Sequence, residues 1–428
     1  MPPAFARVLP QPVPAQARNS DRSVDFNVLL RERQLPLVKP NASNQSLVGA
    51  SRCKGDVRAG EAKPRIDMRI AQVAPLFESV PPEGYGGTER VVSYLTEALV
   101  DAGHDVTLFA SGESRTRARL VPVVDHSIRL AATRPEWLMW HTLMIDRVFA
   151  RAHEFDVIHF HTDFLHYPLA RRCATPCVTT MHGRLDLPDL VPLHRWFAEQ
   201  PLVSISDNQR TPLPDANWQA TIHHGLPQDL YRLQERADDC FVFVGRMSPE
   251  KRVDRAIEIA LACNTRLRIA AKVDPADAAY FEREIRHLLN HPLIDFLGEI
   301  GEKDKNAFIG QARAMLFPID WPEPFGLVMI ESFACGTPVI AYDCGSVAEV
   351  MEDGVTGYIV NDTREAIAAA GRLASLDRRR CRAVFEQRFT AARMARHYVE
   401  VYQALAAARA VAAKPSVFSP GSGTEVRR

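Results

Sequence analysis

The chain has 428 residues and carries 52 lysine and arginine residues against 52 aspartate and glutamate residues, so its formal net charge at pH 7 is zero. Neutrality argues against a protein that grips nucleic-acid phosphates or an anionic membrane through bulk charge. Hydrophobic residues make up 46% of the chain and charged residues 24%, the balance of a globular protein with a large core. This length predicts two domains.

Nothing in the sequence resembles a targeting or membrane segment. No apolar run approaches the roughly 20 residues that cross a bilayer, and the N-terminus lacks the uninterrupted apolar stretch of a signal peptide. The eight cysteines are scattered without a Cys-x-x-Cys pair, which is typical of small core residues in a reducing compartment. We therefore expect a cytoplasmic protein with no nucleic-acid partner, and weak peripheral contact with a membrane stays open.

The two ends of the chain differ from its middle. Residues 1–67 are rich in Pro, Arg, Ser and Asn and show no structural period, which predicts a disordered tail, and residues 412–428 return to a Ser, Gly and Pro composition. From Met68 onward, short apolar runs alternate with longer amphipathic ones, the pattern of β/α units around a parallel sheet. The first helix is expected over residues 88–102, with Thr88 as its N-cap and Gly103 ending it.

Two successive series of strands are predicted along the chain. The first comprises residues 69–74, 106–110, 156–160, 177–181 and 202–205, and the second comprises residues 241–244, 267–271, 293–297, 314–318, 339–342 and 357–360. We interpret them as two facing Rossmann-like, doubly wound α/β domains, over residues 68–235 and 236–392, with a hinge in the polar stretches 212–227 and 234–239. An amphipathic C-terminal helix follows over residues 393–411.

The segment 321–341, WPEPFGLVMIESFACGTPVIA, is the richest in candidate chemistry. Pro324 is typical of a helix start, and residues 325–327 would then offer unpaired backbone N–H groups at a positive helix end, ready for a phosphate or a hydroxyl. Glu323 lies just before that end, and Glu331 lies eight residues later in an otherwise apolar helix. A carboxylate there is costly unless it is hydrogen-bonded, so it is either a structurally paired acid or a ligand-binding one.

Two further loops follow predicted strands. Gly245 ends a strand, and Arg246 and Lys251 then supply two cations that could neutralise a diphosphate, although a basic loop can also be solvated surface. Gly86 and Gly87 link the first strand to the first helix and allow close backbone approach to an anion, although a tight turn would use them too. Neither the dinucleotide fingerprint nor the P-loop pattern is present in this glycine loop.

Histidines gather near the ends of the first-series strands. They are His159, His161, His166, His182, His223 and His224. Imidazole is the commonest metal ligand, but no His-Glu-x-x-His or Asp-x-Asp arrangement accompanies these residues. We expect them to line a core or cleft, and we expect no metal site.

These residues together carry a family resemblance. Glu-Pro-Phe-Gly with a second Glu eight positions after the first resembles the signature of the retaining glycosyltransferases of family 4, which share the two-lobed GT-B fold. The sequence from Gly245 to Lys251 is similar to the phosphate-binding motif of that family, and Thr180-Met181-His182-Gly183 is similar to its T-x-H-G turn. Arg252 stands where the family has glycine, and His224 where it has asparagine. The resemblance extends from Met68 to about residue 410.

The resemblance implies roles for individual residues. Catalytic roles are expected for His182, Glu323, Arg246 and Lys251, where Glu323 and His182 contact the donor sugar and the two cations bind its diphosphate. Glu331 is expected to hold the ribose of the nucleotide. The remaining residues expected to bind the donor are Gly86, Gly87, Gly245, Phe325, Gly326, Leu327 and Val328. The resemblance also implies that the C-terminal helix packs back on the first lobe.

The expected function is that of a retaining, metal-independent glycosyltransferase. It would move a sugar from a UDP- or GDP-linked donor to a carbohydrate or another hydroxyl acceptor without a bound cofactor. One alternative is a phosphorylase or epimerase of the same fold. The other is a non-catalytic protein that binds nucleotide sugars, which would be expected to have lost one of Glu323, Glu331, Arg246 or Lys251.

Overall fold

The structure is a computed structural model that describes residues 67–84, 86–129, 131 and 136–412. The two tails expected to be disordered, residues 1–67 and 412–428, lie outside these ranges except for Asp67 and Ala412. All described residues belong to one unit of the chain, Pro64–Arg428, which contains two parallel sheets.

The first sheet comes from the N-terminal half of this unit. Its strands are β1 (Arg69–Val73), β2 (Asp105–Ala110), β3 (Arg119–Pro122), β4 (Val157–Phe160), β5 (Cys177–Thr180), β6 (Leu202–Ser204) and β7 (Trp218–Thr221). They lie in the order β3-β2-β1-β4-β5-β6-β7 and all pair in parallel. The connecting helices are α1 (Gly87–Asp101), α2 (Trp137–Ala150), α3 (Tyr167–Ala170), α4 (Leu190–Trp196) and α5 (Asp207–Arg210).

The second sheet repeats the same plan. Its strands are β8 (Cys240–Arg246), β9 (Arg266–Lys272), β10 (Ile294–Gly298), β11 (Ala314–Phe317), β12 (Val339–Tyr342) and β13 (Gly357–Val360), in the parallel order β10-β9-β8-β11-β12-β13. Its helices are α6 (Val253–Ala262), α7 (Ala278–Tyr280), α8 (Glu302–Gly310), α9 (Leu327–Ala334), α10 (Val347–Val350), α11 (Thr363–Arg372) and α12 (Arg378–Arg388).

Both sheets have the doubly wound strand order, which confirms the predicted fold class. The chain reverses its direction of growth beside β1 in the first sheet and beside β8 in the second. In open α/β sheets, ligands bind outside the carboxyl ends of the strands at this switch point. β12 is buried along its whole length, as its run of apolar residues predicts for a strand covered on both faces.

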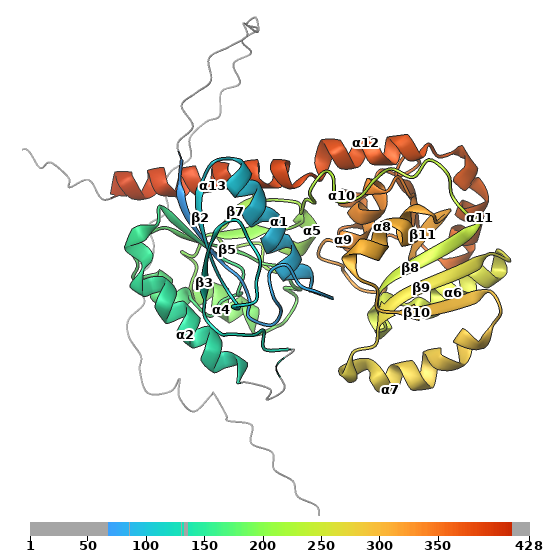
Figure 1. Ribbon diagram of the computed structural model, residues 1–428, viewed down its shortest axis with the longest axis horizontal. Helices are drawn as coiled ribbons and strands as arrows, with labels where there is room; N and C mark the ends of the chain where they lie inside the picture. Colours follow the sequence, from blue (N-terminus) through green and yellow to red (C-terminus); the bar gives the residue numbers. More distant parts are fainter. Residues whose placement is uncertain (1–66, 85, 130, 132–135, 413–428) are drawn as a thin grey trace, which may run out of the picture. The chain divides into compact units, whose positions relative to one another are not determined.

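The last helix, α13 (Ala391–Ala412), connects the two lobes. It follows α12 of the second lobe and runs beside α1 of the first lobe (Figure 1). Tyr398 and Tyr402 on this helix are buried and bond to side chains of the first sheet. The expectation that the C-terminal helix packs back on the first lobe is therefore confirmed. Among the described residues, no helix combines the length and apolar character that crossing a bilayer requires.

Four local predictions need correction. The short edge strands β3 and β7 were missed, because they are half-exposed and lack an apolar run. β7 lies inside the stretch 212–227 that we assigned to the hinge. Helix α1 begins at Gly87, with Gly86 rather than Thr88 as its N-cap. Position 86 has no room for a side chain, since a Cβ there would lie 2.8 Å from Pro82 Cβ. Helix α9 begins at Leu327 rather than at Pro324, after Gly326 adopts a left-handed φ of 78°.

Candidate active site

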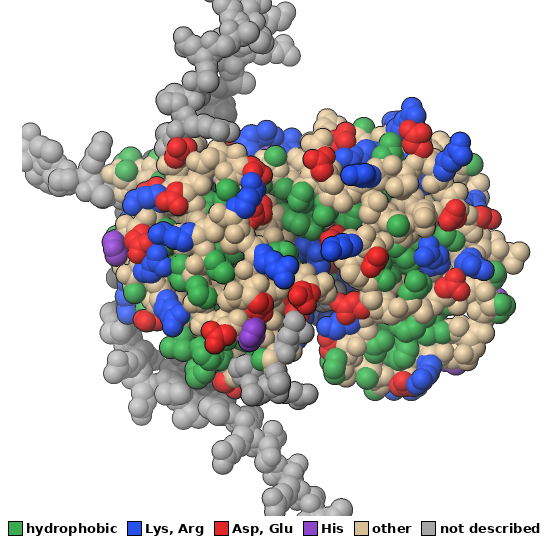
Figure 2. Space-filling model, viewed as in Figure 1, with side chains coloured by type: hydrophobic (Ala, Val, Ile, Leu, Met, Phe, Trp, Pro, Cys, Tyr) green, Lys and Arg blue, Asp and Glu red, His purple; other side chains and the backbone are tan. Residues whose placement is uncertain are grey.

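A cavity of about 620 Å³ lies at the carboxyl ends of the strands and is lined by residues of both lobes. All of the residues expected to have catalytic or donor-binding roles line it: His182, Arg246, Lys251, Glu323, Gly86, Gly87, Gly245, Phe325, Gly326, Leu327, Val328 and Glu331. They converge because each follows or ends a parallel strand, and such ends meet at one edge of the sheet. Figure 2 shows the acidic and basic side chains of the protein interspersed over the visible face of both lobes.

Two helix starts meet across this cavity. Gly87 opens α1 in the first lobe, and a Cβ placed on it would lie 3.9 Å from Leu327 Cδ1, at the start of α9 in the second lobe. The first N–H groups of a helix have no acceptor within the helix and carry partial positive charge. Both starts therefore favour a negatively charged group between them.

Glu323 is buried, and its carboxylate is paired inside the protein. Lys251 Nζ donates a hydrogen bond to Glu323 Oε2, and Trp321 Nε1 donates to the same oxygen over 3.0 Å. The ammonium group also lies 4.9 Å from the centroid of the Trp321 ring, at cation–π distance. Glu323, expected to contact the donor sugar, and Lys251, expected to bind its diphosphate, thus neutralise each other in one ion pair.

Glu331 on α9 is 1% exposed, and only one of its two carboxylate oxygens has a hydrogen-bond partner among the described residues. Its Oε1 accepts a hydrogen bond of 2.9 Å from Lys305 Nζ, whereas Oε2 has no hydrogen-bond partner among the described residues. A buried carboxylate oxygen without a donor is costly, so it indicates a place for a ligand hydroxyl. Lys305 was missed from the sequence because no local pattern links α8 to α9.

Arg246 also lies among acids. Its guanidinium donates to Glu250 over 2.5 Å and lies 3.3 Å from Asp277. Arg252, which stands where glycine is usual in the resembled family, adopts left-handed φ and ψ of 53° and 50° at the start of α6. Its side chain bonds to Asp320 at 2.7 Å and to Asp254 at 2.8 Å, which helps to hold this conformation. The loop therefore keeps the backbone shape that glycine would favour.

A second ion-pair network crosses between the lobes beside the cavity. Arg90 of α1 donates to Glu302 of α8 and, over 2.7 Å, to the carbonyl oxygen of Gly84. Tyr231 donates to the other oxygen of Glu302, Oε1, and Lys305 Nζ lies 3.6 Å from the oxygen that Arg90 binds, Oε2. Since Lys305 also binds Glu331, this network connects the first lobe to the acid that the family resemblance assigns to the ribose.

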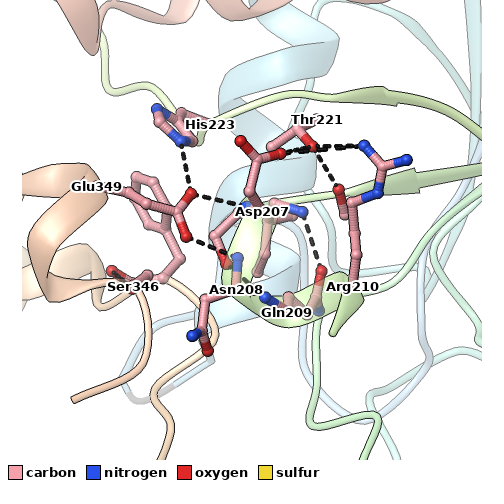
Figure 3. A network of polar contacts seen from close by, with 12 residues as sticks. Asp207, Asn208, Gln209, Arg210, Thr221, His223, Ser346 and Glu349 are labelled. Atoms are coloured by element: carbon pink, nitrogen blue, oxygen red, sulfur yellow. Dashed lines mark hydrogen bonds and ion pairs between the residues drawn. The ribbon is translucent and has the colours of Figure 1, made fainter. Parts of the chain in front are cut away.

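Glu349 on α10 makes another contact between the lobes (Figure 3). Its two carboxylate oxygens accept hydrogen bonds from the backbone N–H groups of Asp207 and Asn208, at 2.7 and 2.6 Å, at the start of α5. His223 Nε2 lies 3.7 Å from the same carboxylate. Burial raises the pKa of Glu349, but the bonds from His223 and the two N–H groups outweigh it and leave the pKa below its ordinary value.

The start of α10 also shapes the cavity wall. The backbone N–H of Ser346 donates to the Glu323 carbonyl oxygen, and the Ser346 hydroxyl donates to that of Phe325, both over 3.0 Å. α10 therefore contacts both lobes. Ser346 at its start binds the loop that carries Glu323, and Glu349 binds the start of α5 in the first lobe. Neither Ser346 nor Glu349 was selected from the sequence, because their partners lie far away along the chain.

Buried ionisable groups line the first-lobe side of the cavity. Burial lowers the pKa of His182 to about 3, so its imidazole is neutral. Burial also raises the pKa of Glu89, in the first turn of α1, to about 7. Among the described residues, no group of three or more His, Cys, Asp or Glu side chains is arranged to hold a metal ion.

Comparisons with known proteins agree with this geometry. Residues 233–388 match the family model of glycosyl transferases group 1, and residues 85–208 match that of Glycosyltransferase Family 4. The glycogen synthase of Mycobacterium tuberculosis is 26% identical over 343 residues, which cover 68% of this chain and 81% of that protein. The chain is a glycosyltransferase of the family 4 type, and thus an enzyme that transfers glycosyl groups.

Solved structures share the GT-B fold. AviGT4, a glycosyltransferase involved in avilamycin A biosynthesis, matches with a TM-score of 0.63 and 26% identity, over 80% of this chain and 98% of that chain. Anabaena Alr3699/HepE in complex with UDP-glucose matches with a TM-score of 0.61 and 17% identity, over 79% of this chain and 100% of that chain.

Proposed function

We propose that this glycosyltransferase moves a sugar from a nucleotide-diphosphate sugar to a hydroxyl acceptor, with retention of configuration and without a metal ion. The observation that carries the proposal is the convergence on one cavity of two cations, two acids and a helix start. A nucleotide-diphosphate sugar needs cations for the diphosphate and acceptors for its ribose and sugar hydroxyls. The crystal structure of Alr3699/HepE with UDP-glucose gives an example of such a donor in this fold.

Each part of the donor has a candidate partner in the cavity. Lys251, Arg246 and the start of α9 would stabilise the negative charge that develops on the leaving diphosphate, the role that a divalent metal plays in other enzymes. The unpartnered Oε2 of Glu331 would accept a ribose hydroxyl. Glu323, freed from Lys251 when that lysine turns to the phosphate, would accept hydroxyls of the transferred sugar.

The reaction would break the bond between the anomeric carbon and the diphosphate oxygen and form a bond from the acceptor oxygen on the same face. The proton of the acceptor hydroxyl would pass to the departing phosphate oxygen, so no protein base is required. His182, being neutral, adds no positive charge near the anomeric carbon as that carbon becomes electron-poor.

A donor screen tests this proposal. The full chain is incubated with UDP-, GDP- and ADP-linked sugars, with and without acceptors, in EDTA, and nucleotide release is measured. We expect release from one donor class that is stimulated by an acceptor and insensitive to EDTA, and a product with the donor's anomeric configuration by NMR. Loss of activity in EDTA, or an inverted product, would overturn the corresponding part of the proposal. Donor binding without release would favour the non-catalytic alternative.

A further inference from the structure

A continuous chain of buried polar side chains runs from the C-terminal helix to the cavity. It runs over three neighbouring strands on one face of the first sheet, where unpaired polar groups would be costly. Its members are the buried Tyr398 and Tyr402 on α13, Gln72 on β1, His159 on β4, His161 just after β4 and Thr180 on β5, and the half-buried His182 at the cavity wall. The proposed reaction uses His182 alone among them, so the rest of the chain needs another explanation.

The branch that reaches His182 has four members. Gln72 Nε2 donates to the Tyr402 hydroxyl over 3.1 Å, and Gln72 Oε1 faces His161 Nε2 at 2.8 Å. His161 Nδ1 in turn lies 2.8 Å from His182 Nε2. Tyr402, Gln72 and His161 are each 3% exposed or less, so water does not compete for these bonds.

The positions of the protons along this branch follow from the hydrogen bond between Gln72 and Tyr402. With the Gln72 amide N–H groups toward Tyr402, its carbonyl oxygen can only accept, so His161 must donate from Nε2. Burial holds the pKa of His161 well below its usual range, so the ring is neutral and its Nδ1 is an acceptor. His182 must then carry its proton on Nε2, which leaves a lone pair on Nδ1. That atom is buried and has no partner among the described residues.

We propose that Tyr402 and Gln72 are positioning residues of the active site, which act through His161 to hold His182 in the neutral tautomer protonated at Nε2. The hydrogen bond that His182 Nε2 donates to His161 fixes the orientation of the His182 ring, which also stacks on His224 with ring centroids 5.3 Å apart. The tautomer places the negative end of the ring dipole at Nδ1. In the proposed function, a fixed dipole of this sign beside the cavity would stabilise positive charge in the reacting sugar. The effect on catalysis rests on the proposed function, whereas the tautomer itself does not.

The other branch supplies a matched control. Tyr402 bonds to His159 Nδ1 at 2.7 Å, His159 Nε2 bonds to Thr180 at 2.7 Å, and Thr180 bonds to Tyr398 at 2.9 Å. Tyr398 thus lies one turn from Tyr402 on the same helix and is equally buried, but its hydroxyl is not needed by Gln72 or His161. Tyr398→Phe and Tyr402→Phe each remove one buried hydroxyl and orphan at least one partner.

The test combines histidine-selective ¹⁵N NMR with steady-state kinetics. The His182 signals are assigned by their loss in His182→Asn. We expect wild-type His182 to be protonated at Nε2. Tyr402→Phe should give a mixture of tautomers and lower kcat about tenfold with little change in KM, while Tyr398→Phe leaves the tautomer unchanged and kcat within about twofold. Gln72→Met should reproduce Tyr402→Phe, and circular dichroism checks that each variant is folded.

Several outcomes would overturn the proposal. Protonation of wild-type His182 at Nδ1 would mean that the chain runs in the opposite direction. An unchanged tautomer in both folded variants, Tyr402→Phe and Gln72→Met, would mean that the chain does not set it. A changed tautomer with unchanged kcat would remove its role in catalysis. If the wild-type protein transferred no sugar at all, the proposed function would fail, while the NMR comparison would still report on the tautomer.

Discussion

Lys251 and Glu323 lie 72 positions apart in the chain and form a direct ion pair at the cavity wall, with side chains 17% and 11% exposed. The pair explains how a protein can keep a lysine and a carboxylate buried at one place, because each compensates the charge of the other. In the proposed function, a donor phosphate that attracted Lys251 would release Glu323 to accept a hydroxyl of the transferred sugar.

Replacing Glu323 tests its place in the reaction. Glu323→Gln keeps an oxygen for Lys251 and Trp321 but removes the negative charge, so we expect kcat to fall by about 100-fold or more while the protein stays folded. Initial rates and a thermal melt measure the two effects. Glu282→Gln is the control, because Glu282 is exposed and pairs with Arg286 within its own helical segment. Unchanged turnover in Glu323→Gln would remove this residue from the mechanism.

Glu331 should determine how the enzyme recognises the ribose hydroxyls of the nucleotide. Glu331→Gln is expected to weaken nucleotide binding about tenfold, because the free Oε2 is the stronger acceptor for a hydroxyl when the group is charged. Calorimetry with the nucleoside diphosphate and with its 2′-deoxy and 3′-deoxy analogues measures the effect. Wild-type protein should bind one deoxy analogue more weakly, and the variant should lose that discrimination. Equal discrimination in both proteins would place the ribose elsewhere.

The contact of Glu349 with α5 should depend on pH. Its folded-state pKa lies below the ordinary value of 4.5, so the carboxylate stabilises the folded state above about pH 4.5, and this stabilisation is lost as the pH falls through the folded-state pKa. Glu349→Gln should therefore lower the free energy of unfolding by about 1 to 2 kcal/mol at pH 7 and by less at pH 3.5. Urea titrations at both pH values measure this difference.

Glu352→Gln provides the comparison for that experiment. Glu352 lies three residues after Glu349 and pairs with Arg388 inside the second lobe. It should show a smaller loss of stability at pH 7. A Glu349 effect that is equal at both pH values would argue that its charge is not what the α5 N–H groups bind.

The left-handed backbone at Arg252 predicts an order of stability among its variants. Alanine at this position keeps the unfavourable conformation and loses the bonds to Asp254 and Asp320, whereas glycine loses the same bonds but removes the backbone cost. Arg252→Gly should therefore be more stable than Arg252→Ala by about 1 kcal/mol. Chemical unfolding of the two proteins measures it, and equal stabilities would contradict a left-handed residue 252.

Much of the fold could be predicted from sequence because the buried strands are continuous apolar runs, as in β12, with clear helices between them. The edge strands β3 and β7 could not, because their residues are half-exposed and lack such a run. The cavity residues could also be predicted from the sequence, for a related reason. Glycines, prolines and charged residues directly after a strand are local signals, and the parallel sheet brings them together.

The partners of these residues gave no such signal. Lys305 and Glu349 belong to helices whose sequences are ordinary, and their roles come from tertiary contacts across the lobes. Gln72 resembles a polar residue on the exposed face of a strand, yet it is completely buried because α13 returns from the end of the chain to cover it. A contact between residues 330 positions apart cannot be inferred from local pattern.

The path of α13 limits how this enzyme can be recombined with its relatives. A chimera that exchanged lobes at the linker before β8 would join the first lobe of one protein to the last helix of another. Tyr398 and Tyr402 would then have to match foreign residues at positions 72, 159 and 180. A chimera that exchanges the first lobe should therefore include residues 391–412 with that lobe and place the second crossover between α12 and α13.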